Sequence, residues 1–147
     1  MLSEHSSVTG QKKMNDIITP EEFVSALAEA AETYTNEICE TVEKGIDRIA
    51  GETLKEVKEL SPVYEGSSKK LKKGRYRKGW KVRKERRRGN IRITVHNEQY
   101  QLVHLLELGH CLRDGTGRVY GNVSAIPHVE TAETHAEEKV DKLLEGL

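Results

Sequence analysis

Residues 74–109 read GRYRKGWKVRKERRRGNIRITVHNEQYQLVHLLELG, and this stretch decides the fold. Its first part belongs to a basic segment, residues 69–88, in which 13 of the 20 residues are lysine or arginine and a single one is acidic. Tyr76, Trp80 and Val82 fall at even spacing within it. Even spacing is strand spacing, because successive side chains of a strand point to opposite faces. We therefore expect a strand here, with one apolar face and one basic face.

The expected strand covers about residues 75–84, and a second strand follows it directly. Gly89 and Asn90 give a turn signal, and residues 91–96 then alternate apolar and polar side chains. Two such runs joined by a short polar turn form an antiparallel β-hairpin. Residues 100–108 are strongly apolar and are followed by glycine, so we expect a short helix that ends there.

A long helix is expected upstream of the basic segment. Thr19 as N-cap, Pro20 at the first helical position and Glu22 three residues after the threonine form a capping box. Ser61 and Pro62 end the helix, because a residue before proline is pushed out of the helical region. Apolar residues recur at steps of three and four between these points, and they are Phe23, Leu27, Ala31, Tyr34, Ile38, Val42, Ile46, Ile49, Val57 and Leu60, with Thr53 in the same series.

This helix is roughly 60 Å long at about 1.5 Å per residue if it is unbroken, which exceeds what a small domain can cover. Either it breaks near Gly45 or Gly51, or part of its apolar stripe packs against another subunit. A coiled coil is a further alternative. The stripe, however, repeats every eleven residues, as from Leu27 to Ile38, and a left-handed coiled coil repeats every seven.

The remaining segments complete an α+β fold, in which the long helix, an antiparallel sheet built on the basic hairpin and the short central helix are followed by a C-terminal helix. Residues 1–18 are polar and aperiodic, so we expect a disordered extension, and residues 19–147 fit a single domain. Two segments, residues 63–73 and 111–125, read as flexible surface loops. The last helix packs on the first helix or on the sheet through a stripe of Val129, Ala132, Ala136, Val140 and Leu143.

Charge is segregated along the chain although the formal net charge is zero. Residues 21–60 hold eleven acidic and four basic residues, and residues 129–147 hold six and two. A chain with acidic ends and a basic middle is electrostatically self-complementary, which suits head-to-tail contact between copies, and its basic middle also suits a nucleic acid. Cys39 and Cys111 lack the spacing of a metal or redox site, and neither a signal peptide nor an apolar run of membrane length occurs. We expect a protein of the cytoplasm with reduced thiols and no membrane contact.

The sequence gives no convincing active site. His104, Glu107 and His110 suggest a metal site, with His128 as a third histidine, but His110 lies about 240° around a helix from His104, at about 100° per residue, and beyond its glycine stop. Glu107 is better explained as an acceptor for backbone amides or for an arginine of the 111–118 loop. No catalytic triad order and no nucleotide-binding loop is present. We expect no enzyme, no metal and no cofactor.

Four motifs together carry a resemblance to a known family. They are Ser61-Pro62-Val63, the segment 74–82 (GRYRKGWKV), the segment 100–110 that ends in LLELGH, and Ile126-Pro127-His128 before an acidic helix. In this combination the chain, from about residue 20 to its end, resembles the small neck and tail-completion proteins of long-tailed double-stranded DNA phages, the relatives of the tenth gene product of phage HK-ninety-seven. It differs by extra residues between Pro62 and Gly74, by Lys73 where that family has threonine, and by the sequence of the loop at 114–117.

The resemblance implies a structural virion protein without catalysis. It implies a homo-oligomeric ring, a hexamer in the family expectation, at the head–tail junction as a neck, tail-completion or tail-terminator component. Its partners would be copies of itself and other neck and tail proteins, with DNA passing through the lumen, and it would assemble in the cytoplasm of the bacterial host. A conducting lumen should not grip DNA, so we expect many of the cations to contact acidic faces of neighbouring subunits.

Two sets of residues carry these expectations. The set that faces a neighbouring subunit, a partner or DNA is Arg75, Arg77, Lys78, Lys81, Arg83, Lys84, Arg86, Arg87 and Arg88. The set implied by the family motif to be structural is Pro62, Gly74, Trp80, Glu107, Gly109, His110, Pro127 and His128. The alternative function is a nucleic-acid-binding module that uses the basic hairpin, residues 69–88, with Trp80 and Tyr76 stacking on bases.

Overall fold

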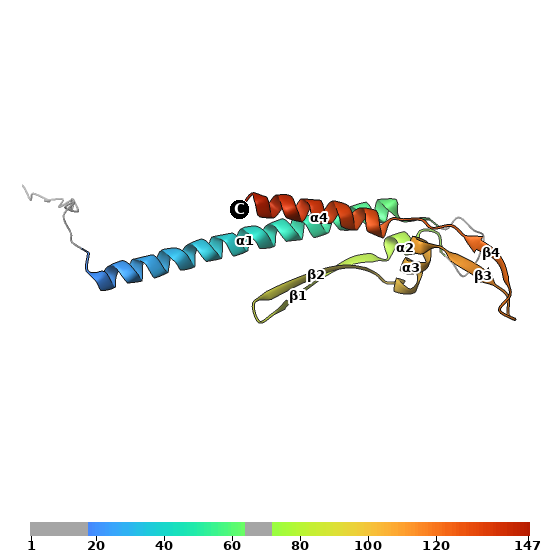
Figure 1. Ribbon diagram of the computed structural model, residues 1–147, viewed down its shortest axis with the longest axis horizontal. Helices are drawn as coiled ribbons and strands as arrows, with labels where there is room; N and C mark the ends of the chain where they lie inside the picture. Colours follow the sequence, from blue (N-terminus) through green and yellow to red (C-terminus); the bar gives the residue numbers. More distant parts are fainter. Residues whose placement is uncertain (1–17, 64–71) are drawn as a thin grey trace, which may run out of the picture. The chain divides into compact units, whose positions relative to one another are not determined.

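The computed structural model describes residues 18–63 and 72–147 (Figure 1). The disorder expected for residues 1–18 and the loop expected at 63–73 therefore lie almost wholly outside the described residues. The elements in order are α1 (Pro20–Leu60), α2 (Arg75–Lys78), β1 (Trp80–Arg87), β2 (Asn90–Asn97), α3 (Tyr100–Leu108), β3 (His110–Arg113), β4 (Val119–Val123) and α4 (Val129–Glu145). The α+β class is confirmed, with two antiparallel sheets of two strands each in the described part.

Helix α1 is continuous over 41 residues and begins at the expected capping box. The Thr19 amide donates to the Glu22 carboxylate at 2.9 Å, and the Glu22 amide donates to the Thr19 hydroxyl at 3.3 Å. The expected alternative of a break near Gly45 or Gly51 is wrong. The chain divides into two compact units, residues 1–37 and 38–147, and α1 contributes to both.

The described part of the first unit is the N-terminal half of α1, residues 18–37. Every side chain in it is exposed. The large apolar residues of the stripe keep about three fifths of their surface in the solvent, with Phe23 at 61%, Leu27 at 59% and Tyr34 at 61%. This half of the helix therefore has a well-formed apolar stripe that its own unit leaves uncovered.

In the second unit, α4 packs along the remainder of α1 (Figure 1). Gly45 is buried, and a Cβ at this position would lie 2.5 Å from a methyl carbon of Leu143. Glycine at this position thus lets α4 approach α1 closely, and it does not break α1. Lys139 pairs with Glu52 at 3.0 Å, which also joins the two helices. Of the two partners expected for the last helix, the first helix is the one it contacts in this way.

The strand expected over 75–84 is wrong in its first half. Arg75–Lys78 form the single-turn helix α2, which starts at Gly74 with φ 72°, and β1 begins only at Trp80. Tyr76 and Trp80 are four residues apart, a spacing that a strand face and a helix face share, so the even spacing could not tell the two apart. Glycine at position 79 lets the Asn97 side chain approach closely, because a Cβ there would lie 2.8 Å from the Asn97 amide oxygen.

The hairpin of β1 and β2 is confirmed and has a regular register, with Val82 opposite Val95 and Glu85 opposite Arg92. The turn lies one residue earlier than expected. Its two central residues are Arg88 and Gly89, both with positive φ (49° and 82°), as two-residue hairpin loops of the primed type require. Residues directly opposite each other share a face, so the hairpin has two distinct faces.

Two further expectations have different outcomes. The short helix ends at Leu108 as predicted, and Gly109 follows it with φ 72°; a Cβ there would lie 2.5 Å from the Val123 carbonyl oxygen.

The prediction of a loop at residues 111–125 is wrong, since this segment contains the β3–β4 hairpin. The Asp114 carboxylate closes its turn by accepting the amides of Thr116 and Arg118, which explains why a glycine-rich stretch is ordered.

The core lies where α1, α2, β1 and α4 meet. Its buried residues are Val57, Tyr76, Trp80 and Ala132, and the partly buried apolar residues packed against them are Leu54, Val95, Leu102, Val103, Leu106 and Val129. Within residues 18–63 and 72–147, no helix is both long and apolar enough to cross a membrane.

Candidate interaction surface and the junction that holds it

Ser61 joins the end of α1 to the start of β1. Its side chain is fully buried, and its hydroxyl donates to the Val57 carbonyl oxygen at 2.5 Å and accepts the Trp80 indole N–H at 2.8 Å. Arg77 donates to the Ser61 carbonyl oxygen at 2.7 Å and 3.1 Å. The last carbonyls of α1 thus have partners, which a helix end requires, and the root of the hairpin is fixed to the helix.

His128 lies at the centre of the same core and is fully buried. Its Nε2 is 2.7 Å from the Tyr76 hydroxyl and its Nδ1 is 2.7 Å from the Ile126 carbonyl oxygen. Both ring nitrogens therefore have partners. Trp80 packs edge-on against the rings of Tyr76 and His128. Burial, with a smaller effect of the Glu107 charge, raises the pKa of Tyr76 to about 12.

Glu107 caps helix α4 from outside that helix. Its carboxylate accepts the backbone amides of His128, Val129 and Glu130 at 2.9, 3.0 and 2.8 Å. Burial alone raises the pKa of Glu107, but the three amide donors outweigh it and hold the pKa below its usual range. Of the two roles considered for Glu107, acceptance from backbone amides is the one found. Across the described residues no group of three or more His, Cys, Asp and Glu side chains could hold a metal ion.

The inner face of the β1–β2 hairpin, the one that carries Val82, Lys84 and Arg86, meets α1. Lys84 Nζ lies 2.7 Å from the Glu43 carboxylate and 2.8 Å from that of Asp47. Arg86 also bonds Glu43. The hydrogen bonds that Glu43 accepts from Lys84 and Arg86 lower the pKa of Glu43, and those that Lys84 donates to Asp47 and Glu43 raise the pKa of Lys84. Two cations expected to face a partner are therefore paired within their own chain.

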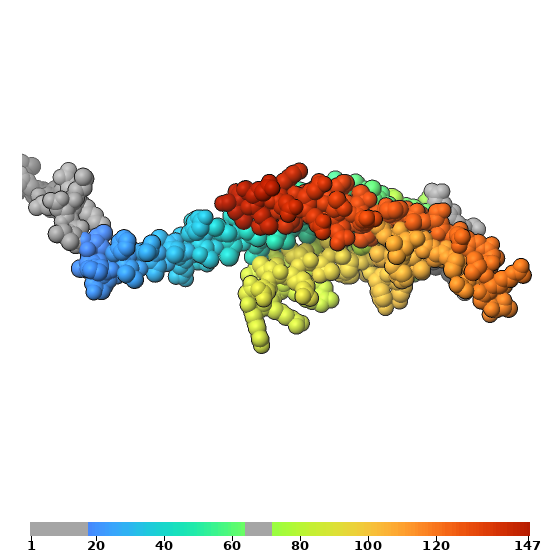
Figure 2. Space-filling view, viewed as in Figure 1, coloured from blue at the N-terminus to red at the C-terminus, as the bar shows by residue number. Residues whose placement is uncertain are grey.

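The opposite face of the hairpin is directed away from these contacts, and we call its three arginines, Arg83, Arg87 and Arg92, the arginine face. They surround a hollow of about 430 Å³ together with Glu85 and Asn90. Arg83 bonds Glu85, whereas Arg87 and Arg92 have no ion-pair partner among the described residues. Figure 2 shows several long side chains projecting from the hairpin, coloured yellow-green.

The other cations predicted to face a partner are distributed differently. Lys81 on β1 bonds Glu98 and lowers its pKa, and Arg77 is held by α1 as described. Arg75, Lys78 and Arg88 are exposed and have no ion pair within the described residues. The described part of the basic segment is thus divided between cations in intrachain contacts and exposed cations without an ion pair, and Arg87 of the arginine face belongs to the second set.

The aromatic residues proposed for base stacking are not available for it. Tyr76 is 8% exposed and Trp80 is 4% exposed, and both belong to the core. This part of the nucleic-acid hypothesis is wrong, for the physical reason that the indole and phenol rings fill the space between α1, α4 and the hairpin. Base recognition by stacking needs an accessible ring face.

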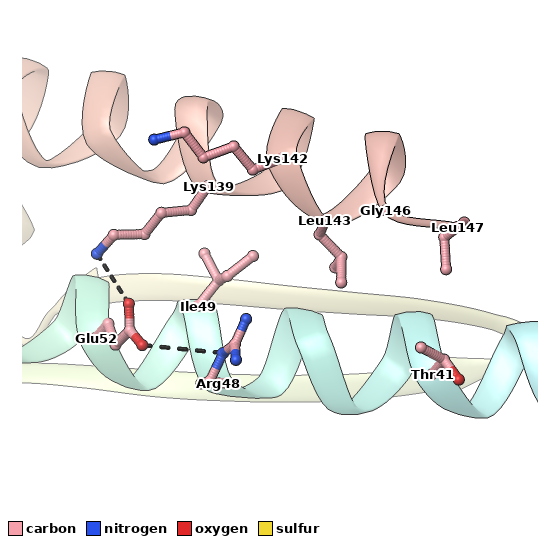
Figure 3. A pocket seen from close by; sticks show the side chains of 9 residues that line it. All are labelled: Thr41, Arg48, Ile49, Glu52, Lys139, Lys142, Leu143, Gly146 and Leu147. Atoms are coloured by element: carbon pink, nitrogen blue, oxygen red, sulfur yellow. Dashed lines mark ion pairs between the residues drawn. The ribbon is translucent and has the colours of Figure 1, made fainter.

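Two pockets flank these surfaces. One lies between α1 and α4 and has a volume of about 320 Å³; within it Glu52 pairs with both Arg48 and Lys139 (Figure 3). The second, of about 350 Å³, is apolar and is lined by Pro62, Val63, Lys72, Gly74, Arg75, Tyr76, Gln99, Leu102 and Leu106. In the first pocket, Glu52 therefore has two cationic partners from its own chain. The second places two motif residues, Pro62 and Gly74, beside the core.

The remaining motif residues follow α3. His110 opens β3 and is half-buried, and its Nδ1 has no hydrogen-bond partner in the described part of the chain. Pro127 is exposed before His128. His104, considered as a metal ligand, is exposed on α3. The structure therefore brings Trp80, Glu107 and His128 together and leaves His104 apart from them.

One family model matches this chain, over residues 21–109, and its description is "Bacteriophage HK97-gp10, putative tail-component". The match covers more than half of the chain and runs from the first turn of α1 through α3 to Gly109. The chain belongs to this family and is a structural component of a phage tail, hence of the virion. No curated protein matches it, and no solved structure matches it.

Sequence reasoning missed several residues of this surface. Glu43 and Asp47 read only as members of an acidic helix, although they fix the hairpin. Asn97 donates its side-chain amide to the Tyr76 carbonyl oxygen at 2.9 Å and accepts the Gln99 amide at 2.8 Å. An asparagine at a strand end is a common turn signal, which could have indicated this role.

Proposed function

We propose that the protein forms a homo-oligomeric ring at the head–tail junction of a long-tailed phage or prophage. Six copies are the expectation from the family resemblance, and other neck and tail proteins would be its neighbours. Assembly would take place in the cytoplasm of the host. The fold serves as a structural part and no enzymatic role is proposed.

The observation that carries this proposal is the uncovered N-terminal half of α1. Its stripe of Phe23, Leu27 and Tyr34 is about three fifths exposed, and burying one such side chain contributes about 1.5–3 kcal/mol. Contiguous apolar surface on a helix marks an interaction site. The same stripe is covered by α4 further along α1, so the uncovered half is expected to receive another chain.

Solution mass, measured by light scattering on nucleic-acid-free protein, tests self-association. The wild type should give a mass of several subunits, and Phe23→Ser with Leu27→Ser should reduce it to a single subunit without changing the melting temperature. Leu108→Ser, at a residue 77% exposed on α3, is the matched control and should assemble. A single-subunit mass for the wild type at every protein concentration would contradict the ring.

The position in the virion needs its own experiment. Gold-labelled antibody against the chain, viewed on whole particles by electron microscopy, should mark the junction of head and tail. Label confined to the distal tail tip would refute the junction assignment and leave the tail-component assignment standing.

A second candidate function is DNA binding through the arginine face, because guanidinium groups suit phosphate as well as carboxylate. It predicts affinity for duplex DNA that falls steeply as salt rises. Fluorescence anisotropy with a labelled duplex at low salt would test it. Lack of binding there would eliminate it.

A further inference from the structure

The inner face of the basic hairpin already has a binding partner within its own chain. The inner face of the hairpin places Lys84 and Arg86 against Glu43 and Asp47, which lie one turn apart on α1. The contact is a cationic two-stranded surface on the acidic side of a helix. It requires carboxylates at helical spacing and no aromatic platform.

The acidic side of α1 continues into the uncovered half of the helix. Glu21, Glu29 and Glu32 are exposed and have no ion pair with any described residue. At about 100° per residue, these three lie opposite the stripe of Leu27 and Tyr34. No basic residue occurs between residues 18 and 43. This half of the helix therefore presents an uninterrupted negative side opposite its apolar side.

The arginine face is the complementary surface of the same chain. Arg83, Arg87 and Arg92 are exposed, and only one of them has an internal carboxylate partner. Guanidinium groups pair with carboxylates in a two-pronged geometry that a lysine ammonium cannot make. Each chain thus carries both an acidic helix side and an arginine face, so every copy can offer both halves of a head-to-tail contact.

We propose that the arginine face of one copy binds the acidic side of α1, at Glu21, Glu29 and Glu32, in a second copy. This inference rests on the proposed self-association and specifies its contact. The two surfaces are different parts of the chain, so the contact is head-to-tail, and head-to-tail contacts close into rings when the rotation between copies permits. Binding on the acidic side leaves the apolar stripe open for a further subunit contact.

A second copy suits the arginine face better than DNA does. Glu85 lies among the three arginines, and its negative charge opposes a phosphate backbone. Tyr76 and Trp80 are buried and cannot stack on bases. The other face of the same hairpin already binds the carboxylates of this helix.

Charge exchange tests the contact. One variant combines Glu21→Lys, Glu29→Lys and Glu32→Lys, a second combines Arg83→Glu, Arg87→Glu and Arg92→Glu, and a third carries all six changes. Either single-surface variant should lose at least about tenfold in association constant at low salt, because like charges then meet. The third variant should regain assembly, because both signs are reversed together. Analytical ultracentrifugation gives the masses, and melting temperatures show that each variant is folded.

The matched control changes the same charge elsewhere. Glu133→Lys, Glu137→Lys and Glu138→Lys alter three exposed acids of α4 and should leave assembly unchanged. If wild type assembles but the six-change variant stays dissociated, this contact is wrong while self-association stands. If wild type stays a monomer, the proposed function falls as well. If the arginine variant assembles normally but loses binding to a duplex DNA, the arginine face belongs to DNA and the contact is refuted.

Discussion

Glu107 is far in sequence from the groups that it binds. It lies on α3, and its carboxylate accepts hydrogen bonds from three backbone amides at the start of α4. A carboxylate at a helix N-terminus satisfies amides that have no partner inside the helix and interacts favourably with the helix dipole. The contact therefore joins the two helices without using an apolar surface.

Replacing Glu107 by Gln should lower the free energy of unfolding by about 1–2 kcal/mol, because the amide group has one acceptor oxygen and turns a donor toward a donor. Chemical denaturation with tryptophan fluorescence gives the value. Glu138→Gln, an exposed change on α4, is the control. Equal stability of both variants would show that the cap contributes little.

The pH dependence has a definite sign. The pKa of Glu107 is held below its ordinary value of 4.5 in the folded protein, so the unfolded chain binds more protons between the two values. The stability from this group is complete above about pH 4.5 and decreases as the pH falls through the folded pKa. A pH series of melting temperatures should show a weaker acid loss for Glu107→Gln than for wild type. An identical acid loss in both proteins would contradict this.

Tyr76→Phe should cost about 1–3 kcal/mol, because it leaves Nε2 of the buried His128 without its partner. The Tyr76 hydroxyl is its contact at 2.7 Å. Thermal unfolding measures the effect, and Tyr120→Phe, at a residue 68% exposed, should change nothing. A loss as small as that of the control would mean that water replaces the hydroxyl.

At the residue scale, the sequence indicated what a side chain could bind better than where the folded chain places that side chain. The acceptor role of Glu107 was one of two alternatives that its acidic, apolar context suggested, but the distance of 21 residues to His128 is set by the fold. Tyr76 and Trp80 sit among cations and resemble stacking groups by composition. Only the packing of α4 over them shows that they are core, and no local pattern records a contact between segments so far apart.

Gly45 and Gly51 have opposite surroundings within one helix. Gly45 is buried against Leu143, whereas Gly51 is exposed and a Cβ there meets nothing within 4 Å. Both are helical, so alanine should add a similar propensity gain at each. The difference between them isolates the packing of α4.

Gly51→Ala should stabilise the protein by about 0.5–1 kcal/mol, as alanine does in exposed helix interiors. Gly45→Ala should be less stable than Gly51→Ala, because its Cβ displaces the Leu143 side chain. In the background Leu143→Ala the penalty at Gly45 should shrink, which a double-mutant cycle by urea denaturation detects. Additive effects would mean that Leu143 rotates away at no cost.

At the element scale, segments with a clear period or a clear stop signal were predictable, including the nine-residue helix α3, and the single-turn helix and the weakly alternating strands were not. The capping box, the apolar stripe and the proline stop defined α1, and alternation defined β2. Helix α2 is a single turn between Gly74 and Gly79, too short for any period to distinguish it from a strand. The β3–β4 hairpin was missed because the side chain of Asp114 orders its turn, and turn glycines without strong alternation resemble a loop.

At the scale of the whole molecule, the segregation of charge has two uses that the sequence could not separate. Lys84 and Arg86 neutralise acids of α1 within the chain, whereas the arginine face remains outward. The sequence indicated that opposite charges would pair. The register of β1 and β2 determines which cations form ion pairs within the chain. The family assignment agrees with a structural role in the tail and leaves the choice of contact to experiment.

Salt should therefore affect assembly far more than folding. At about 1 M salt the screening length is about 3 Å, so a contact between exposed charges on separate copies should weaken strongly. The intrachain pairs are partly exposed, and solvent-exposed pairs contribute about 0–1 kcal/mol each. Light scattering should show loss of the oligomer while the melting temperature of the subunit changes by a few degrees. A fall of the melting temperature in parallel with the mass would indicate that the subunit folds only as an oligomer.

The cap on α4 bears on how this chain can vary. Glu107 lies inside the region matched by the family model, and the amides that it binds lie beyond that region, at residues 128–130. Every residue except proline carries such an amide. The carboxylate thus anchors the final helix through backbone groups, and this contact does not depend on the side chains of Val129 and Glu130. The exposed side chains of α4 can therefore change without removing this cap.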